Sequence, residues 1–212
     1  MFCYQCQEAA KGSGCTIKGV CGKTGEVSDL MDGLMYVTKG VSWLAGNLRN
    51  KNMETEEADK FVFEALFLTI TNANFDDSRI MAKIMQGMAI KKLLLEKARK
   101  ADVLPQSLPA AVSWESDDAE EVNHRAKLVG VLSTEDEDIR SLRELLIYGI
   151  KGMAAYAEHA FNLGYRDDSV FGFMHQGMAA SLDPHKTAEE LVQLVMTCGE
   201  YGVKVMDLLD KA

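Results

Sequence analysis

Four of the five cysteines in this chain of 212 residues lie within its first 21 positions. They are Cys3, Cys6, Cys15 and Cys21, with the spacing Cys-x2-Cys-x8-Cys-x5-Cys. The segment over residues 1–25 is also rich in glycine, and it has too few large apolar residues to form a hydrophobic core of its own. We therefore expect these thiols to hold the segment in place.

The start of the chain bears on the chemistry of the thiols. Residues 1–6 lack the basic and then apolar regions of a signal peptide, so we expect a cytoplasmic protein in which thiols stay reduced. The cysteine count is odd, which also argues against a disulfide framework. Four thiols this close together in a reducing compartment predict a metal site. The net charge of −9 argues against nucleic acid as the main partner. The lack of a long apolar run argues against a membrane-spanning helix.

Thiolate ligands favour zinc or an iron–sulfur cluster. Structural zinc sites with four cysteines usually have two short Cys-x2–4-Cys pairs, and Cys3 with Cys6 is the one such pair here. The first histidine that could complete a zinc site is His124. A [4Fe–4S] cluster on four thiolates is anionic, and the nearby Lys18 and Lys23 can offset its charge. The residues thus favour an iron–sulfur cluster and leave zinc open.

The rest of the chain has the apolar period of α-helices. Apolar residues recur every three or four positions, and there is no strand-like alternation of useful length. Ser28 is the predicted N-cap of the first helix, and Thr134 with Glu137 and Thr187 with Glu190 match capping boxes. The expected helices cover about 28–48, 56–73, 77–100, 117–132, 135–163, 167–181 and 187–210.

We expect an all-α fold of two antiparallel helical bundles behind the cysteine-rich loop segment. Pro105 and Pro109 remove helix donors and mark a connection. The predicted parts are the metal-binding segment 1–25, the first bundle 26–100, the linker 101–116 and the second bundle 117–212.

Several long stretches resemble one known family. The opening MFCYQCQE, followed by GCT at 14–16 and GVCGK at 19–23, is similar to the N-terminus of the hybrid cluster proteins, the prismane or hydroxylamine reductase family. Further family-like stretches are TITNANF at 69–75, EDIRSLRELLIYG at 137–149, KGMAAYA at 151–157 and GEYGVK at 199–204. The resemblance covers essentially the whole chain.

By this resemblance, Cys3, Cys6, Cys15 and Cys21 match the ligands of the family's proximal cubane. Their spacing is similar to that of the members that bind [4Fe–4S]; members with longer spacers bind [2Fe–2S]. The family implies a domain of two three-helix bundles that takes electrons from a reduced electron-donor protein and passes them to a hybrid iron–sulfur–oxygen cluster. The parent enzyme is an oxidoreductase that reduces hydroxylamine to ammonia, with nitric oxide as a related substrate.

The sequence departs from the family at its end. Family chains continue past the equivalent of Ala212 into two α/β domains that hold the hybrid cluster, and those ligand positions are absent here. We therefore expect an N-terminal fragment or a natural short form that has no catalytic residues of its own. Its expected partners are the missing domains, another chain that supplies them, or a second copy in a homo-oligomer. The alternative is a zinc-stapled helical interaction module without redox activity.

Other residues with metal-ligand chemistry have structural explanations. Cys198 lies in an apolar helical run and is predicted to be a buried, inert thiol. Glu121 and His124 have the spacing of one half of a di-iron site, but the second half is absent from the sequence. The dense small residues around Gly149 and Gly152 predict close helix packing.

Overall fold

The computed structural model describes residues 2–6, 14–70 and 74–212, and that part of the chain is all-α, without strands. The predicted fold class is confirmed. None of the helices described is both long and apolar enough to cross a lipid bilayer. The elements are α1 (Gly25–Arg49), α2 (Glu56–Leu68), α3 (Asp77–Lys100), α4 (Ala110–Ser113), α5 (Ala119–Ala126), the 3₁₀ turn η2 (Val131–Ser133), α6 (Glu137–Asn162), α7 (Asp168–Ala180) and α8 (Ala188–Asp210).

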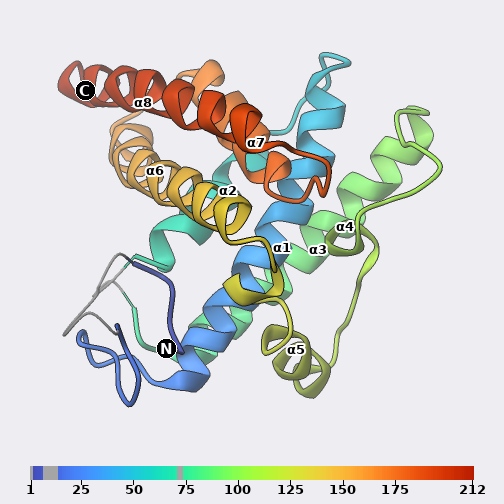
Figure 1. Cartoon of the computed structure of the whole chain (residues 1–212). Coiled ribbons are helices and arrows are strands. Elements are labelled where there is room, and N and C mark those ends of the chain that lie inside the picture. The colour runs from blue at the N-terminus through green and yellow to red at the C-terminus, as the bar shows by residue number, and fades with distance from the viewer. Residues whose placement is uncertain (1, 7–13, 71–73) are drawn as a thin grey trace.

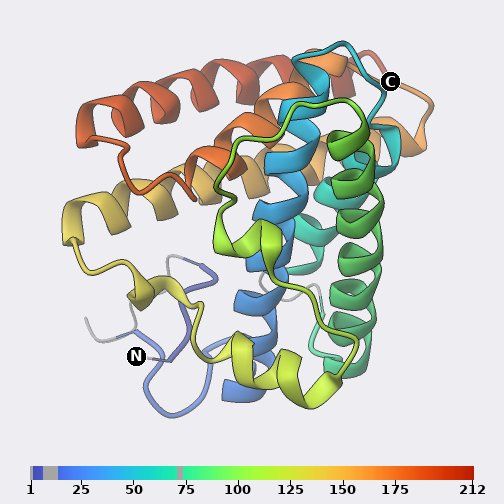
Figure 2. The ribbon, with the colours of Figure 1, turned by 90° about the vertical axis from the view of Figure 1, so that its right-hand side faces the viewer.

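The long helices form two sets that cross each other steeply (Figure 1, Figure 2). One set is α1, α2 and α3, and the other is α6, α7 and α8. Helix α1 also packs against α7, and α2 packs against α6, so that a single hydrophobic core runs through both sets. The division into separate bundles at 26–100 and 117–212 stays a prediction.

One of the two predicted capping boxes is confirmed. Thr187 caps α8, and the side chain of Glu190 bonds back to the backbone N–H of Thr187. The other prediction is wrong, because the N-cap of α6 lies two residues after Thr134. Asp136 is its N-cap and accepts a hydrogen bond from the N–H of Ile139. Aspartate caps a helix as well as threonine does, so the sequence offered two equivalent starts.

The predicted helix over 117–132 is also shorter than expected. Helix α5 ends at Ala126, and the chain then turns through Gly130 into η2. A Cβ on Gly130 would lie 2.7 Å from Oδ2 of Asp32, so only glycine fits against α1 at this point. This contact between residues far apart in the sequence lies beyond the helix end, and helical periodicity does not report it.

The linker over residues 101–116 contains a short helix, α4, that was predicted as irregular chain. The fully buried Lys91 of α3 fastens it, because its ammonium donates hydrogen bonds to the carbonyls of Ala111 (2.9 Å) and Trp114. Gly40 of α1 lets the backbone at Ala111 approach closely. The linker is therefore part of the packed structure.

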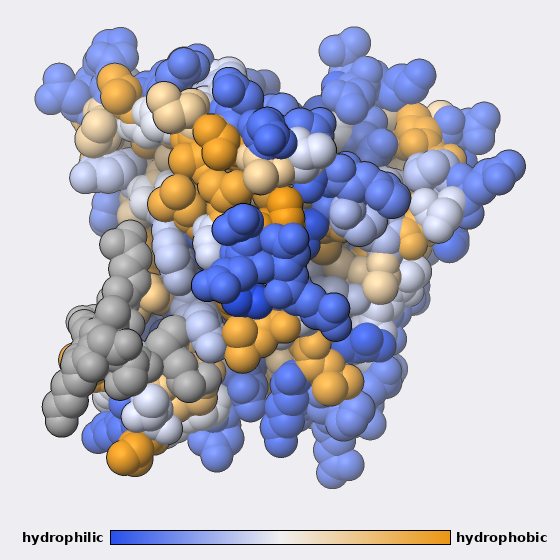
Figure 3. Space-filling view, viewed as in Figure 1, coloured by the Kyte–Doolittle hydropathy of each residue, from blue (hydrophilic) through white to orange (hydrophobic). Residues whose placement is uncertain are grey.

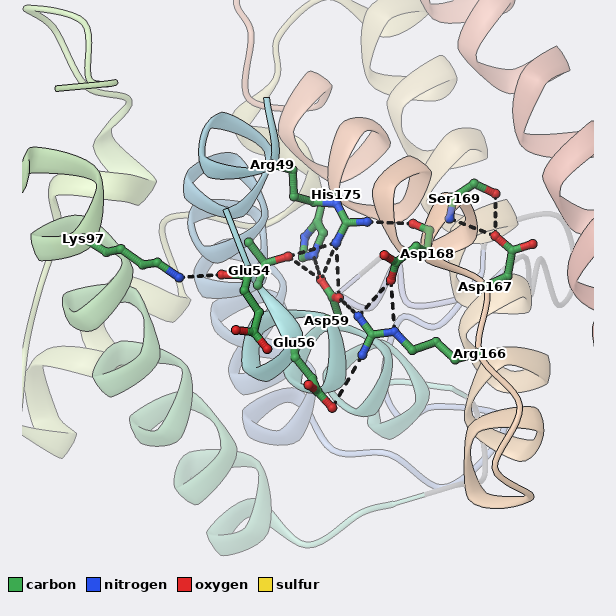
Figure 4. A network of polar contacts seen from close by, with 11 residues as sticks. Arg49, Glu54, Glu56, Asp59, Lys97, Arg166, Asp167, Asp168, Ser169 and His175 are labelled. Carbon is green, nitrogen blue, oxygen red and sulfur yellow. Dashed lines mark hydrogen bonds and ion pairs between the residues drawn. The ribbon is translucent and has the colours of Figure 1, made fainter. Parts of the chain in front are cut away.

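A buried ionic network joins the two helix sets (Figure 4). Asp59 of α2 accepts hydrogen bonds from Arg49 of α1, from Arg166 at 2.7 Å, and from Nε2 of His175 on α7 at 2.8 Å. Burial alone raises the pKa of Asp59, but the hydrogen bond and charge of His175, together with Arg49, outweigh it and hold the pKa below its usual value. This network ties α1, α2 and α7 together.

Candidate metal centre

The described part of the cysteine segment lies in the angle between the start of α1 and α6 (Figure 1, Figure 2). The N–H of Phe2 donates a hydrogen bond to the carbonyl of Cys15 at 2.9 Å, which places the first and the middle part of the segment side by side. Cys15 is buried, and Cys3, Cys6 and Cys21 are partly exposed. The described residues 2–6 and 14–24 thus lie side by side against the helical body.

A tight turn precedes α1. Gly22 donates its N–H to the carbonyl of Gly19 at 2.8 Å and has a φ of +97°, which favours glycine. The N–H of Gly19 donates to the carbonyl of Lys23 at 3.0 Å. Cys21 sits inside this turn, and Gly14, with a φ of +66°, directly precedes the third cysteine. The glycines therefore set the backbone path next to two predicted ligands.

Two side chains of α6 hold the first cysteine pair. The hydroxyl of Tyr148 lies 2.8 Å from the carbonyl oxygen of Tyr4 and 3.2 Å from that of Cys6. One turn further along α6, Nζ of Lys151 lies 2.8 Å from Oε1 of Gln5. The backbone between the two cysteines is thus bonded to α6 by residues more than 140 positions away in sequence.

Helix α1 holds the same loop from the other side. The side-chain amide of Gln5 donates a hydrogen bond to Asp32. Ser28 is buried within α1 and donates to the carbonyl of Phe2 at 3.4 Å. Its predicted role as N-cap is wrong, because α1 begins at Gly25 and Thr24 is the cap. The hydroxyl of Ser28 therefore holds the cysteine segment and does not cap the helix.

Two buried ammonium groups lie next to the thiols. Lys23 is 1% exposed, and its hydrogen bond within the described structure is to Sδ of Met31, a weak acceptor. Burial lowers the pKa of Lys151 to about 8; Glu144 opposes this shift, and Lys23 adds to it. Of the two predicted charge-balancing lysines, Lys23 is therefore buried at the site, and Lys18 is exposed. Glu144 and Asp32 face Lys151, and an anionic group on the thiols would balance the charge of Lys23.

The donor set fits a thiolate-bound iron–sulfur cluster. Four cysteines, glycine-rich turns and buried lysines are the groups that bind and neutralise such an anionic cluster. Among the described residues, no three cysteine, histidine or carboxylate side chains gather around one point as they would for a single metal ion. Each cysteine of a [4Fe–4S] cluster binds a different iron, so that arrangement is not required of a cluster.

Cys198 lies away from this segment, in the interface between α8 and α6. It is buried, as predicted, and burial raises its pKa to about 11. Its Sγ packs against Gly149, where a Cβ would lie only 2.6 Å away, and it lies 3.7 Å from Sδ of Met153. The predicted close packing is thus present at Gly149, whereas none of the atoms in the described part of the chain lies within 4 Å of a Cβ on Gly152.

Four residues that hold the segment were not predicted from the sequence. They are Gln5, Asp32, Tyr148 and Lys151. A signal for two of them is present in the sequence, because Asp32 and Lys151 occupy positions that the helical period assigns to the buried face. An ionisable side chain at such a position predicts a polar partner across the core.

The outer face of α8 is unusually apolar. Figure 3 shows apolar side chains gathered over α8 and next to α6. The exposed residues Val192, Met196, Val203 and Met206 follow the helical spacing along one face of α8. This stripe is the kind of surface that another protein domain covers.

Comparison with known proteins gives a consistent result. The model of the Prismane/CO dehydrogenase family matches residues 1–212. A hydroxylamine reductase of Desulfitobacterium hafniense is 55% identical over 213 residues, and one of Parabacteroides distasonis is 52% identical over 212 residues. A third, of Thermoanaerobacter pseudethanolicus, is 50% identical. Each alignment covers 100% of this chain and 39% of the relative, so the chain spans about two fifths of their length.

Proposed function

Because this chain belongs to the Prismane/CO dehydrogenase family, we propose that it is the [4Fe–4S]-bearing electron-transfer domain of a hydroxylamine reductase. Cys3, Cys6, Cys15 and Cys21 each supply one thiolate ligand. The chain spans about two fifths of the length of its relatives. In this proposal hydroxylamine, or nitric oxide, is reduced in the remaining three fifths of a full-length relative. That reaction is part of the proposal.

The observation that carries the proposal is the buried ammonium group of Lys23 in the cysteine segment, whose hydrogen bond within the described residues is to Sδ of Met31; the neighbouring Lys151 already faces Glu144 and Asp32. A buried cation without an anionic partner is destabilising by several kcal/mol. Neutral thiols do not supply that partner, and a thiolate-bound cluster does. A single structural zinc ion on four thiolates would also be anionic. The charge of the site and the number of cysteines therefore support a metal bound by thiolates. Family membership favours iron over zinc.

The cluster, when bound, supplies the ability to take up and release one electron. The residues of this chain hold and tune it. Tyr148 and Lys151 fix the backbone of the first cysteine pair, and Lys23 and Lys151 stabilise the added negative charge. Burial of Cys15 excludes water on the side of the helices, while Cys3, Cys6 and Cys21 leave an accessible edge for a donor.

The partners belong to the same proposal. A reduced electron-donor protein approaches the partly exposed cysteines, where Ile17 and Val20 are exposed apolar side chains on either side of Lys18. The domains that make up the remaining length of the relatives, in the same or another chain, cover the apolar stripe of α8. The proposed location is the cytoplasm, where such a cluster and its thiols stay reduced.

Metal analysis of anaerobically purified protein tests the proposal. We expect about four irons and four sulfides per chain and a broad brown visible absorbance. Replacement of any one of Cys3, Cys6, Cys15 and Cys21 by alanine should remove or strongly alter that spectrum. The matched control is Cys198→Ala, which removes a buried thiol outside the segment and should leave the spectrum intact.

Two results would contradict the assignment. One zinc per chain without colour would identify the site as a structural zinc staple, because zinc has a filled d shell and is colourless. An unchanged spectrum in all four single variants would show that these cysteines do not hold the chromophore.

A further inference from the structure

Asp32 is a buried carboxylate placed next to the predicted ligand loop. It lies on α1, is 9% exposed, and accepts a hydrogen bond at Oδ1 from the side-chain amide of Gln5. Gln5 is itself buried and lies between Cys3 and Cys6 in the sequence. A single amide group therefore connects this acid to the loop that holds two of the four thiols.

The orientation of that amide is fixed by Lys151. An ammonium group only donates hydrogen bonds, so Oε1 of Gln5 must face Nζ of Lys151, at 2.8 Å. The NH₂ group then faces Asp32. It can donate equally well to a carboxylate or to the carbonyl oxygen of a protonated carboxyl. Asp32 can therefore gain or lose a proton without breaking its contact with the ligand loop.

The second oxygen of Asp32 faces a small polar cavity. Oδ2 lies close to Gly130, at the edge of a cavity of about 40 Å³. That volume is large enough for about two water molecules, and the lining is polar. The ionisable side chains that line it besides Asp32 are Tyr36, Lys39, Arg143, Glu144 and Lys151. The cavity therefore gives Asp32 a polar environment with room for water.

The charges that face Asp32 come from two helices and balance each other. Burial is the largest influence and raises the pKa of Asp32 to about 7, with Glu144 of α6 and Asp29 of α1 acting in the same direction. Lys151 of α6 and Lys39 of α1 oppose the shift. The cysteine segment contributes Lys23, which acts on Lys151. The acid thus titrates in the neutral range, where a small change of local charge alters its protonation.

We propose that Asp32 is a proton-binding site whose occupancy is coupled to the oxidation state of the cluster. The inference rests on the function proposed above and adds to it. Asp32 takes up one proton from solvent for each electron that a reduced donor protein delivers, and it releases the proton when the electron leaves. The only bond that forms or breaks in the protein is the O–H bond of Asp32. The driving force is the attraction between the added negative charge and the proton in a poorly hydrated site.

The test is the midpoint potential of the reconstituted chain as a function of pH, with dithionite as the reductant. In the wild type we expect the potential to fall by up to about 59 mV per pH unit across the neutral range. Asp32→Asn keeps the hydrogen-bond acceptor for Gln5 but cannot bind a proton, so its potential should be independent of pH there. The matched control is Asp29→Asn, on the same helix one turn away, which should keep the slope.

Glu144→Gln provides an independent variant. It removes a negative charge that raises the pKa of Asp32, so the pH-dependent range of the potential should move to lower pH. Infrared difference spectra, reduced minus oxidised, give a direct readout. A protonated carboxyl band should appear on reduction, shift in heavy water and be absent from Asp32→Asn.

The outcomes separate this inference from the proposed function. A loaded wild-type chain whose potential does not depend on pH overturns the inference alone, and so does a slope that persists in Asp32→Asn. A chain that binds no iron and sulfide overturns the proposed function and the inference with it. The wild-type measurement decides the first point even where the variant does not fold.

Discussion

Replacement of Asp59 by alanine is expected to lower the free energy of unfolding by about 3 kcal/mol. Asp59 is 2% exposed and accepts hydrogen bonds from four side chains (Figure 4). These are Arg166 at 2.7 Å, His175 at 2.8 Å, Thr55 at 3.0 Å and Arg49 at 3.2 Å. One carboxylate thus joins α1, α2 and α7.

The magnitude follows from what each partner can do once the carboxylate is gone. Arg49 and Arg166 are 23% and 31% exposed and can turn to solvent, so each lost pair contributes about 0–1 kcal/mol. His175 is 1% exposed, and its Nδ1 already has no hydrogen-bond partner within the described structure. Without Asp59 the whole imidazole is buried and unsatisfied, which costs about 1–3 kcal/mol.

Urea unfolding followed by circular dichroism at neutral pH measures the effect. The matched control is Glu56→Ala, which removes a 3.6 Å ion pair to the same Arg166 at a site that is 61% exposed, and it should cost less than about 1 kcal/mol. The double variant Asp59→Leu with His175→Phe should recover part of the loss, since it buries no unsatisfied polar group. An Asp59→Ala variant no less stable than the control would refute the reasoning.

The pH dependence of the same variant has a definite sign. The pKa of Asp59 is lowered in the folded protein, so its contribution is fully present above the ordinary value of 3.8 and is lost as pH falls through the lower folded value. The stability difference between wild type and Asp59→Ala should therefore be constant at neutral pH and shrink only in acid.

Two further predictions concern the core. Burial lowers the pKa of Lys91 from 10.5 to about 8, so its charged form is disfavoured in the folded protein. The stability of the wild type relative to Lys91→Met should therefore rise by up to about 3 kcal/mol as pH increases from 8 to above 10.5. Denaturant titrations across that range measure the difference, and a difference that does not change with pH would contradict the prediction. Gly87→Ala should lower stability by about 1–3 kcal/mol, because its Cβ would lie 2.5 Å from Phe61 and 2.7 Å from Val37. The control Gly46→Ala has open space around it and should stabilise α1 by up to about 1 kcal/mol. Comparable thermal stabilities of the two variants would contradict the packing argument.

The helical body could be predicted from the sequence because its signal is local. The period of apolar residues gives α3 over 77–100 with both ends as found, and Thr187 marks the start of α8. The errors arise where distant residues decide the outcome. The chain after α5 turns through Gly130 against Asp32, and Lys91 fastens α4 from another helix. Neither contact leaves a periodic trace in the sequence.

The candidate site divides in the same way. The four cysteines are recognisable by residue type and spacing, and the family match covers them. The residues that hold the segment are not, because Gln5 bonds to Asp32, 27 positions away, and to Lys151, 146 positions away. Only the presence of ionisable residues on apolar helix faces indicates them beforehand.

These long-range contacts explain how a segment without a core can be positioned precisely enough to hold a cluster. The hydrophobic core is built from residues of the helical body, and none of the four N-terminal cysteines belongs to it. The two helices then present polar and charged groups to the segment, chiefly Asp32 from one side and Tyr148 and Lys151 from the other. Buried ionisable groups of this kind are destabilising unless each has a partner. The segment supplies a partner for Asp32 and Lys151 through Gln5, and within the described residues Lys23 bonds to Sδ of Met31, which leaves its positive charge for an anionic group bound by the thiols to balance. The same residues that position the ligand loop therefore set the charge of its surroundings, which is why a change of charge at the thiols is expected to reach Asp32.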